Sequence, residues 1–324
     1  MRKEKSDLNP AEEKHQRKLD LAARAAWLYY IGNNTQDQIA EKLHVSRQAA
    51  QRLVSLAVAE KLIKFRLDHP IAECAELAGK LCERFGLRYC KIAPADDSAG
   101  LFNSLGICAA EYLEGLLTSQ KPSTLAFGTG RTLRALVGQI PAMQQPQHKI
   151  VSIVGNMSHD GRASHFEAVM HLADKIHAQA FLLQTPVVTS TEQEKQFLQA
   201  LPAFRTVHKL ALQADAVFVG ISQIGSDCPM YQDGFLNTAE LKSLLKHKAV
   251  GEIIGWSFDK DGRILDCAVN DRIGSIPLAD LKNSHVVAVS GGPEKTAPIL
   301  GALRGKLIAG LITDENTARK LLKS

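Results

Sequence analysis

The spacing of apolar and polar positions predicts three helices in the first seventy residues. From Leu19 to Ile31 the apolar residues recur at a three-four spacing, which places them on one face of a helix that ends at Gly32-Asn33-Asn34. This predicted apolar stripe is Leu19, Ala22, Ala23, Ala26, Trp27 and Tyr30. A short helix follows from Gln36 to Leu43. Its start carries a capping box, because the Thr35 hydroxyl can reach the third helical amide while Gln38 reaches back.

The turn after this second helix indicates a helix-turn-helix. His44-Val45 turns the chain, and Ser46 can cap a third helix that runs from about Arg47 to Lys61. Ala40 is small enough to let the second and third helices cross closely, and Val45 supplies the apolar residue that such a turn needs.

The outer face of the third helix carries side chains that suit DNA. Arginine pairs with guanine, glutamine pairs with adenine, and hydroxyl groups reach the phosphate backbone. Polar outer faces and caps are common in helices, but a cap, a small residue, a turn and this face in register favour DNA binding. We expect Gln48 and Gln51 to read bases. The residues expected to contact DNA are Thr35, Gln36, Ser46, Arg47, Gln48, Gln51, Arg52 and Ser55.

The alternating segment from Leu62 to Leu67 predicts a wing strand with basic side chains. Asp68-His69-Pro70 breaks the alternation and begins a linker. We therefore expect two domains, a helix-turn-helix DNA-binding domain over residues 1–70 and a larger domain for effector binding and oligomerisation over residues 71–324.

Beyond the linker, apolar runs alternate with helical stretches. A helical pattern from Cys74 to Phe85 leads to the first run, Tyr89 to Ile92. Runs that are apolar throughout suit strands buried on both faces, so the alternation predicts an α/β fold with a doubly wound, Rossmann-like parallel sheet. Ligands of such sheets bind at the carboxyl ends of the strands. The other predicted strands are Ser123 to Phe127, Lys149 to Val154, Gln179 to Leu183, Ala216 to Ile221 and Val286 to Ser290.

Two loops at such strand ends suit an anion. The first leaves one strand and opens the helix Leu133 to Ile140, and its glycines let backbone amides approach a phosphate. The second, Ser290 to Lys295, precedes the helix Thr296 to Leu303, and Lys295 would neutralise the anion. Either loop also fits a simple tight turn, but two in one sheet favour a phosphate site. The first loop is Gly128, Thr129, Gly130, Arg131 and Thr132. Its expected hydrogen-bond donors to the ligand are the side chains of Thr129, Arg131 and Thr132.

Charge separates the two predicted domains. The chain has 324 residues and a formal net charge of +5, and residues 1–66 hold thirteen Lys and Arg against eight Asp and Glu, so the excess lies there. A basic excess confined to a small segment is the footprint of a nucleic-acid-binding module. No apolar stretch reaches the length of a membrane span and the charged N-terminus is unlike a signal peptide, so we expect a cytoplasmic protein with no membrane partner.

The remaining candidate chemistry is sparse. The six cysteines form no CxxC pair, which argues against a zinc cage and against a disulfide framework. His159, His165 and His171 recur every six residues, a spacing that fits no ligand signature. We expect no metal, no cofactor and no catalytic residue.

Several motifs resemble the SorC family of bacterial sugar-responsive regulators, which is also grouped with the deoxyribonucleoside-type regulators. The resemblance extends from about Leu19 to Leu322. Its most specific stretches are Gly130-Arg131-Thr132-Leu133, residues 214–221, Asn270-Asp271-Arg272-Ile273-Gly274, residues 290–295 and residues 311–318.

The resemblance implies an effector domain similar to sugar-phosphate isomerases, a homotetramer or dimer of dimers, and operator binding that a phosphorylated sugar modulates. By position, Gly130, Arg131 and Thr132 resemble the phosphate loop and Lys295 resembles its counter-charge. Glu252 resembles an acidic residue that meets sugar hydroxyls, and Asp271 and Arg272 would line the same pocket.

Two departures from the family leave the identity of the sugar open. Gly128-Thr129 stands where Ser-Trp is usual, and residues 155–160 lack the paired glycines often seen.

We therefore predict a transcriptional regulator of a carbohydrate or polyol catabolic operon. One alternative is an enzyme resembling sugar-phosphate isomerases or deaminases, although the sequence offers no acid–base pair. The expected effector is a small phosphorylated sugar or polyol, and an unphosphorylated polyol is the alternative. A pocket lysine, with Lys295 the candidate, could also capture an aldehyde sugar as a Schiff base. The operator sequence and the direction of regulation stay open.

Overall fold

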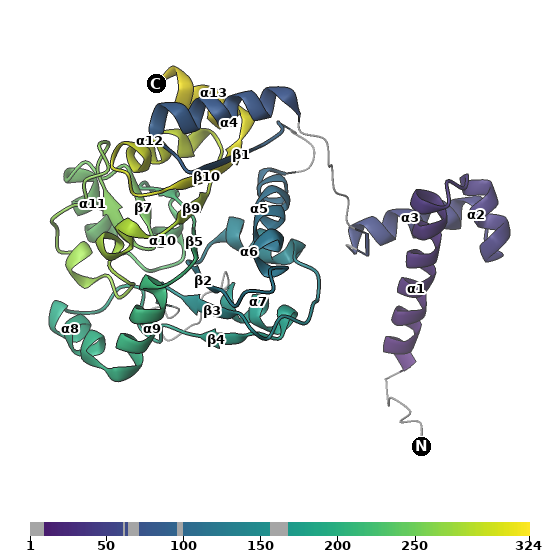
Figure 1. The fold of residues 1–324 in the computed structure, drawn as a ribbon, viewed down its shortest axis with the longest axis horizontal. Coiled ribbons are helices and arrows are strands. Elements are labelled where there is room, and N and C mark those ends of the chain that lie inside the picture. The colour runs from purple at the N-terminus through teal and green to yellow at the C-terminus, as the bar shows by residue number, and fades with distance from the viewer. Residues whose placement is uncertain (1–9, 61, 64–70, 96–99, 156–167) are drawn as a thin grey trace. The chain divides into compact units, whose positions relative to one another are not determined.

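The chain is described here from a computed structural model that covers residues 10–60, 62–63, 71–95, 100–155 and 168–324. It divides into two compact units, Met1–His69 and Pro70–Ser324. The first unit is helical, whereas the second is built on a parallel sheet (Figure 1).

The first unit consists of α1 (Pro10–Ala26), the π-helical turn η1 (Trp27–Ile31), α2 (Gln36–Leu43) and α3 (Arg47–Ala59). Its two small apolar clusters contain Ala22, Ala25, Ala26, Ile39, Ala50, Val54 and Ala57. The predicted apolar stripe was wrong in part. Ala25 is buried where Ala23 was expected, and Trp27 is 65% exposed because the chain widens into a π-turn there.

The local signals around α2 and α3 act as the sequence predicted. The Thr35 hydroxyl accepts from the Gln38 amide, and Gln38 Oε1 accepts from the Thr35 amide at 2.8 Å, so the capping box is confirmed. His44 adopts the left-handed conformation (φ 53°) that turns the chain, and the Val45 amide donates to Ala40. Ser46 then caps α3 by accepting from the amide of Ala49. The helix-turn-helix is confirmed.

The predicted wing falls mostly outside the described residues. Leu62 and Ile63, its first two positions, lie in no strand, and residues 64–67 and the linker at 68–70 are not among those described. 

The second unit contains the predicted doubly wound parallel sheet. Its seven strands lie in the order β1-β10-β9-β5-β2-β3-β4, and every neighbouring pair is parallel. The strands are β1 (Tyr89–Ala93), β2 (Thr124–Phe127), β3 (Lys149–Ser152), β4 (Gln179–Phe181), β5 (Ala216–Val219), β9 (Val286–Val289) and β10 (Gly310–Asp314). Six of these were expected at these places, whereas β10 was not.

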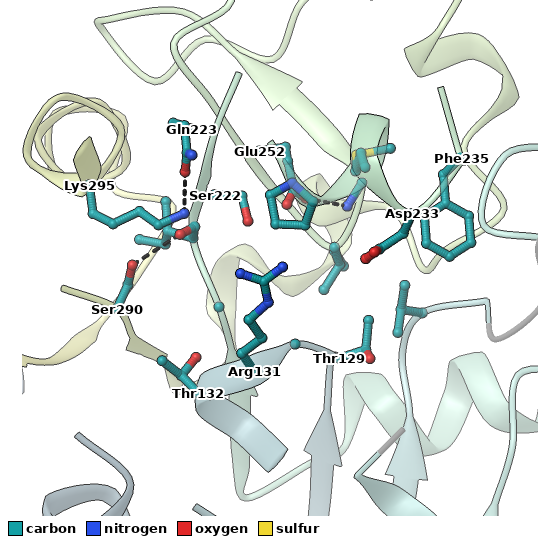
Figure 2. A pocket seen from close by; sticks show the side chains of 18 of the residues that line it. Thr129, Arg131, Thr132, Ser222, Gln223, Asp233, Phe235, Glu252, Ser290 and Lys295 are labelled. Carbon is teal, nitrogen blue, oxygen red and sulfur yellow. Dashed lines mark hydrogen bonds between the residues drawn. The ribbon is translucent and has the colours of Figure 1, made fainter. Parts of the chain in front are cut away.

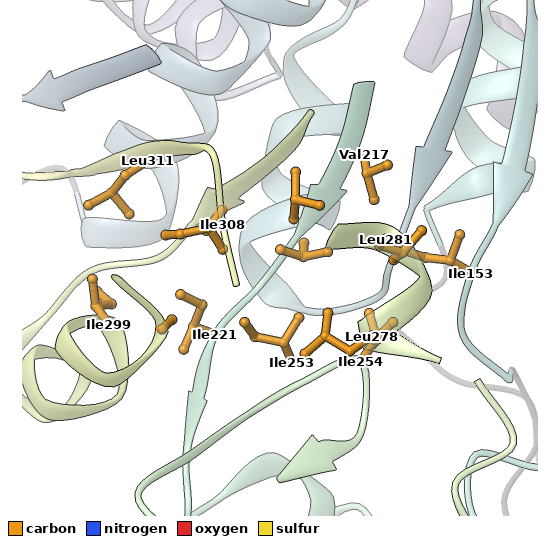
Figure 3. Packing of buried hydrophobic residues seen from close by; sticks show 14 of the residues in the cluster. Ile153, Val217, Ile221, Ile253, Ile254, Leu278, Leu281, Ile299, Ile308 and Leu311 are labelled. Carbon is orange, nitrogen blue, oxygen red and sulfur yellow. The ribbon is translucent and has the colours of Figure 1, made fainter. Parts of the chain in front are cut away.

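Helices cover both faces of this sheet (Figure 1). Successive strand residues point to opposite faces and therefore belong to different apolar clusters. In β5, Val217 and Val219 belong to one apolar cluster and Ala216 and Phe218 to the other. Figure 3 shows part of the first cluster, to which Val217 of β5, Leu311 of β10 and Ile299 of α12 all belong. One cluster takes in α4 (Ala72–Phe85), α9 (Pro202–Leu212), α12 (Thr296–Arg304) and α13 (Glu315–Lys323). The other takes in α5 (Leu101–Leu117), α6 (Arg131–Gln139) and α7 (Val169–Ile176).

The order of the strands places a switch point in the middle of the sheet. From β2 the chain moves outward to β3 and β4, crosses through α8 (Glu192–Ala200) and α9, and returns as β5 on the other side of β2. Loops that leave β2 and β5 therefore diverge, and a ligand crevice opens at such a point.

Between β5 and β9 the chain builds a small antiparallel sheet that the sequence did not predict. It has a core of its own, which includes Cys228, Leu244 and Ile273. Its elements are β6 (Ser222–Gln223), β7 (Gly251–Ile253), β8 (Trp256–Phe258), α10 (Pro229–Gln232), α11 (Thr238–Lys246), and the 3-10 turns η2 (Asn270–Arg272) and η3 (Leu278–Asn283).

The six cysteines are free thiols. Over the described ranges, no cluster of three His, Cys, Asp or Glu side chains is placed to hold a metal. His159 and His165 lie outside those ranges. No helix within them combines the length and apolar character needed to cross a bilayer.

Candidate functional site

A cavity of about 300 Å³ lies at the carboxyl ends of β2, β5 and β9, three neighbours in the sheet. The loops after these strands form one wall, and the segment from β6 through α10 to β7 forms the other (Figure 2). The residues that line it are Phe102, Thr129 to Thr132, Val154, Val187, Gly220 to Gln223, Asp227, Pro229, Met230, Asp233, Phe235, Glu252, Ile254, Gly255, Ser290, Gly291, Glu294 and Lys295.

The first predicted loop lines this cavity as expected, with one exception. Thr129, Gly130 and Arg131 face it, and Figure 2 shows the Arg131 side chain extending between the two walls. Gly128 is buried beneath the floor, where its amide donates to Phe218 and an added Cβ would meet Ile254 at 3.0 Å. A side chain at this position would therefore disturb the join between β2 and β5.

The backbone of Gly130 explains why glycine is needed there. With φ 134° and ψ 166°, Gly130 occupies a region that other residues rarely adopt. It is the N-cap of α6 and, as a glycine, supplies no side-chain cap of its own. The amides of the first turn have no carbonyl partners within the helix and carry partial positive charge, which attracts an anion.

Two hydroxyl groups join the strand-end loops to one another. Thr132 Oγ1 donates to the carbonyl of Val289 at 3.0 Å, and Ser290 Oγ donates to the carbonyl of Ile221 at 3.0 Å. Thr132 was expected to donate to the ligand, but its proton is used in this bond, so its hydroxyl can only accept. 

The second predicted loop contributes side chains, whereas its glycine amide faces the protein. The Gly292 amide donates to Asp314 Oδ2 at 2.8 Å and to Thr317 Oγ1 at 2.9 Å. Lys295, at the end of the 3-10 turn η4 (Pro293–Lys295), reaches the cavity and donates to Gln223 Oε1. The second loop therefore contributes the cationic side chain of Lys295 to the pocket.

Lys295 and Glu252 are the two most perturbed charges of the pocket. Burial lowers the pKa of Lys295, the carboxyl groups of Glu252, Glu294 and Asp227 act to raise it, and Arg131 lowers it by the smallest amount. Burial raises the pKa of Glu252, whose Oε2 accepts from the Gly255 amide at 2.7 Å. Lys295 and Arg131 thus lie close enough to act on each other, and an anion bound beside both would be attracted by both.

Asp271 and Arg272 do not line the cavity, contrary to the expectation from the family resemblance. The Arg272 guanidinium pairs with Glu240 and donates to the carbonyl of Thr189, and Asp271 is exposed. These bonds fix η2 to the neighbouring segments, because a guanidinium has enough donors to join several carbonyls.

Sequence reasoning missed part of the pocket. Ser222 and Gln223 follow the buried strand β5, and polar residues after such a run are the signal that could have identified them. Asp227, Asp233 and Phe235 come from the segment around α10, which carries no strand-end signal.

In the first unit, the expected DNA-contacting face of α3 is exposed. Arg47, Gln48, Gln51, Arg52 and Ser55 are all accessible, opposite the buried Ala50, Val54 and Ala57. Arg47 lies 3.5 Å from the exposed carboxylate of Asp37 on α2, and Arg52 Nε donates to the Gln48 carbonyl. Thr35 and Ser46 are exposed at the N-termini of α2 and α3, and Gln36 is half-buried.

Comparison with known proteins identifies the family of the second unit. A family model described as "Putative sugar-binding domain" matches residues 69–323, which is most of the chain. The chain belongs to this sugar-binding family.

Similar proteins extend across both units. The erythritol catabolism regulatory protein EryD of Brucella abortus is 29% identical over 303 residues, which cover 93% of this chain and 96% of that protein. The deoxyribonucleoside regulator of Bacillus subtilis is 29% identical over 309 residues, covering 94% and 98%. These relatives of the sugar-binding family are named regulators, and the assignment to SorC-type transcriptional regulators is confirmed.

The fold of this member of the sugar-binding family is also found in a solved structure. The full-length sorbitol operon regulator SorC of Klebsiella pneumoniae superposes with a TM-score of 0.71 at 24% identity, covering 94% of this chain and 98% of that one. 

Proposed function

We propose that this transcriptional regulator controls a carbohydrate or polyol catabolic operon by binding its operator through the first unit and a small phosphorylated sugar or polyol through the second. The observation that carries the proposal is the meeting of the glycine-capped N-terminus of α6, Arg131 and Lys295 in one cavity. Regulation by a sugar or polyol is supported by the erythritol catabolism relative.

A phosphoryl group fits the cationic part of this cavity. The first amides of α6 would donate to its oxygens, Arg131 would bind two of them at once, and Lys295 would supply a second positive charge. Thr129 and Gly130 complete this part of the wall. 

The rest of the cavity fits hydroxyl groups. Glu252 offers carboxylate oxygens next to Ser222 and Gln223, and side chains of this kind accept hydrogen bonds from sugar hydroxyls. Phe235 and Met230 supply apolar surface for the carbon chain of the ligand. 

For DNA we propose that α3 enters the major groove of a double-stranded operator. Gln48 and Gln51 would read base edges, while Arg47 and Arg52 would contact phosphates. Thr35, Gln36, Ser46 and Ser55 would position the unit on the backbone. The exposed N-cap residues of α2 and α3 support this assignment, because helix N-termini favour phosphate.

Two further properties belong to this proposal. A regulator of operon transcription would act in the cytoplasm, and operators with two-fold symmetry are matched by proteins that associate as homo-oligomers. A homotetramer or dimer of dimers is the assembly that we propose. Light scattering on the purified chain measures it directly.

Calorimetry on the full chain tests the effector site. Each polyol or sugar is titrated beside its own terminal phosphate ester, in wild type and in Lys295→Met and Lys295→Arg. We expect the phosphate ester to bind more tightly, Lys295→Met to weaken it, and Lys295→Arg to retain most of the affinity because it keeps the charge.

Two results of the same titrations would contradict the proposal. Equal affinity for free polyols and their phosphates would remove the phosphate site. Loss of binding in Lys295→Arg as complete as in Lys295→Met, together with a borohydride-trapped adduct in the wild type, would replace charge pairing with covalent capture.

A further inference from the structure

The described lining of the pocket holds more carboxyl groups than cations. Arg131 and Lys295 are its cations, and the carboxyl groups are those of Asp227, Asp233, Glu252 and Glu294. One phosphoryl group can be matched by the cations and the α6 N-terminus. Among the described lining residues, a second one would meet carboxylates, which like charge disfavours.

Three of these carboxyl groups are engaged or directed outward. Glu252 accepts from the Gly255 amide and acts on Lys295. Asp227 Oδ2 accepts from Gln223 Nε2 at 3.0 Å. Glu294 is exposed to solvent. 

Asp233 differs from the other three. Its backbone is fixed at the end of α10, where its amide donates to Pro229 at 2.8 Å, but its carboxylate makes no hydrogen bond or ion pair with any described residue. The side chain is half-buried. Figure 2 shows the carboxylate directed into the cavity, with Arg131 between it and Lys295 in this view. Asp233 therefore presents to the cavity a hydrogen-bond acceptor that has no partner among the described residues.

We propose that Asp233 restricts the effector to a single phosphoryl group. The proposal rests on the phosphate site of the proposed function. With the phosphoryl group at α6, the carboxylate of Asp233 accepts a hydrogen bond from a hydroxyl at the other end of the ligand. A second phosphoryl group in the hydroxyl's place meets an unpaired negative charge, so bisphosphates are rejected. 

The size of the cavity agrees with a small monophosphate. About 300 Å³ lies at the lower end of ligand pockets, which span roughly 300–1,000 Å³. Such a volume suits one sugar or polyol chain. The class of ligand is therefore a short sugar or polyol with one terminal phosphate.

Calorimetry on the full chain tests this specificity. The probes are tetritols, pentitols and hexitols in three forms: free, with one terminal phosphate, and with phosphates at both ends. For the monophosphate that binds best, we expect its bisphosphate to bind at least about ten-fold more weakly. Asp233→Asn should bring the two affinities close together, because the amide keeps the size of the side chain and removes its charge.

Asp174→Asn serves as the matched control. Asp174 is exposed on α7 outside the pocket, so the ratio of the two affinities should stay at the wild-type value. A second variant, Asp233→Ser, guards against misfolding of Asp233→Asn. Thermal melting of each variant confirms that it folds.

The outcomes separate this inference from the proposed function. A bisphosphate that binds wild type as tightly as the monophosphate would overturn the role of Asp233 and leave the phosphate site standing. An unchanged ratio in both Asp233 variants would do the same. Free polyols that match their monophosphates, or no binding by any probe, would overturn the proposed function and the restriction together.

Discussion

At the scale of single residues, the pocket depends on a lysine, Lys295, whose pKa is lowered by burial. The carboxyl groups of Glu252, Glu294 and Asp227 raise this pKa and Arg131 lowers it, but burial is the largest effect in the free protein. A bound phosphate dianion would raise the pKa again, since opposite charge favours the protonated amine. Binding above the pKa of the free protein must therefore take up a proton.

This linkage predicts how affinity depends on pH. The dissociation constant for a monophosphate should rise as the pH increases from neutrality towards about 10, and the rise should begin below the ordinary titration range of lysine, near 10.4. Calorimetry in buffers of different ionisation enthalpy measures the proton uptake. Lys295→Arg should remove the dependence, because arginine stays charged. A wild-type affinity that is constant over this range would contradict the assignment.

Gly130 allows a second prediction at this scale. Alanine at φ 134° is strained, so Gly130→Ala should lower the free energy of unfolding by about 1–3 kcal/mol and weaken effector binding. Denaturant unfolding of the full chain, followed by circular dichroism, measures the first effect.

Gly79 supplies the control for Gly130. It lies exposed within α4, and an added Cβ meets nothing within 4 Å. Gly79→Ala should therefore stabilise the chain by up to about 1 kcal/mol through helix propensity. If Gly130→Ala and Gly79→Ala changed the free energy of unfolding in the same direction, the backbone conformation at position 130 would not explain why that residue is a glycine.

At the scale of elements, Ser46 has two roles that substitution can separate. Its hydroxyl caps α3, and it is proposed to contact DNA. Ser46→Ala should cost about 1 kcal/mol of stability by removing the cap. Ser46→Asp should keep the cap and the stability but weaken operator binding, because its charge repels phosphate. Melting and fluorescence anisotropy measure the two effects. Undiminished DNA binding by Ser46→Asp would place this residue away from the backbone.

The recognition helix should separate base reading from phosphate contact. Gln51→Ala should cost about 1–3 kcal/mol at the cognate operator and leave binding to unrelated DNA unchanged. Arg52→Ala should weaken both and reduce the salt dependence. Anisotropy titrations on both DNAs at several salt concentrations measure this. Equal losses for Gln51→Ala on both DNAs would make Gln51 a phosphate contact.

The elements also show what the sequence can and cannot predict. The capping box at Thr35 and the buried run that forms β5 were predicted because short-range spacing determines them. The strand β10 was missed because Gly310 and Thr313 interrupt its apolar run. The π-turn at Trp27 has no signal in side-chain spacing, so the apolar stripe of α1 was partly misplaced.

The residues of the candidate site were likewise predicted only in part from the sequence. Gly130, Arg131 and Lys295 were predicted, because loops that leave adjacent parallel strands meet at one edge of the sheet. Asp233 and Phe235 were not, since they reach the pocket through the antiparallel insertion. Asp271 and Arg272 matched the family motif but form bonds within the insertion, which only the fold reveals.

At the scale of the whole molecule, the proposed function requires that effector and operator influence each other. If the effector changes operator affinity by some factor, the operator must change effector affinity by the same factor. Neither unit alone can show this coupling, because the helix-turn-helix and the pocket belong to different compact units. The full chain is therefore the object to measure.

The most direct test is the affinity of the full chain for an operator fragment, selected from genomic DNA, with and without the monophosphate that binds it best. Anisotropy of the labelled fragment should show a shift of about five-fold or more, the usual range of allosteric coupling, and calorimetry with operator present should show the same factor. Lys295→Met should bind the operator and fail to respond. A ligand that occupies the pocket while operator affinity stays unchanged would contradict the proposal that this pocket controls DNA binding.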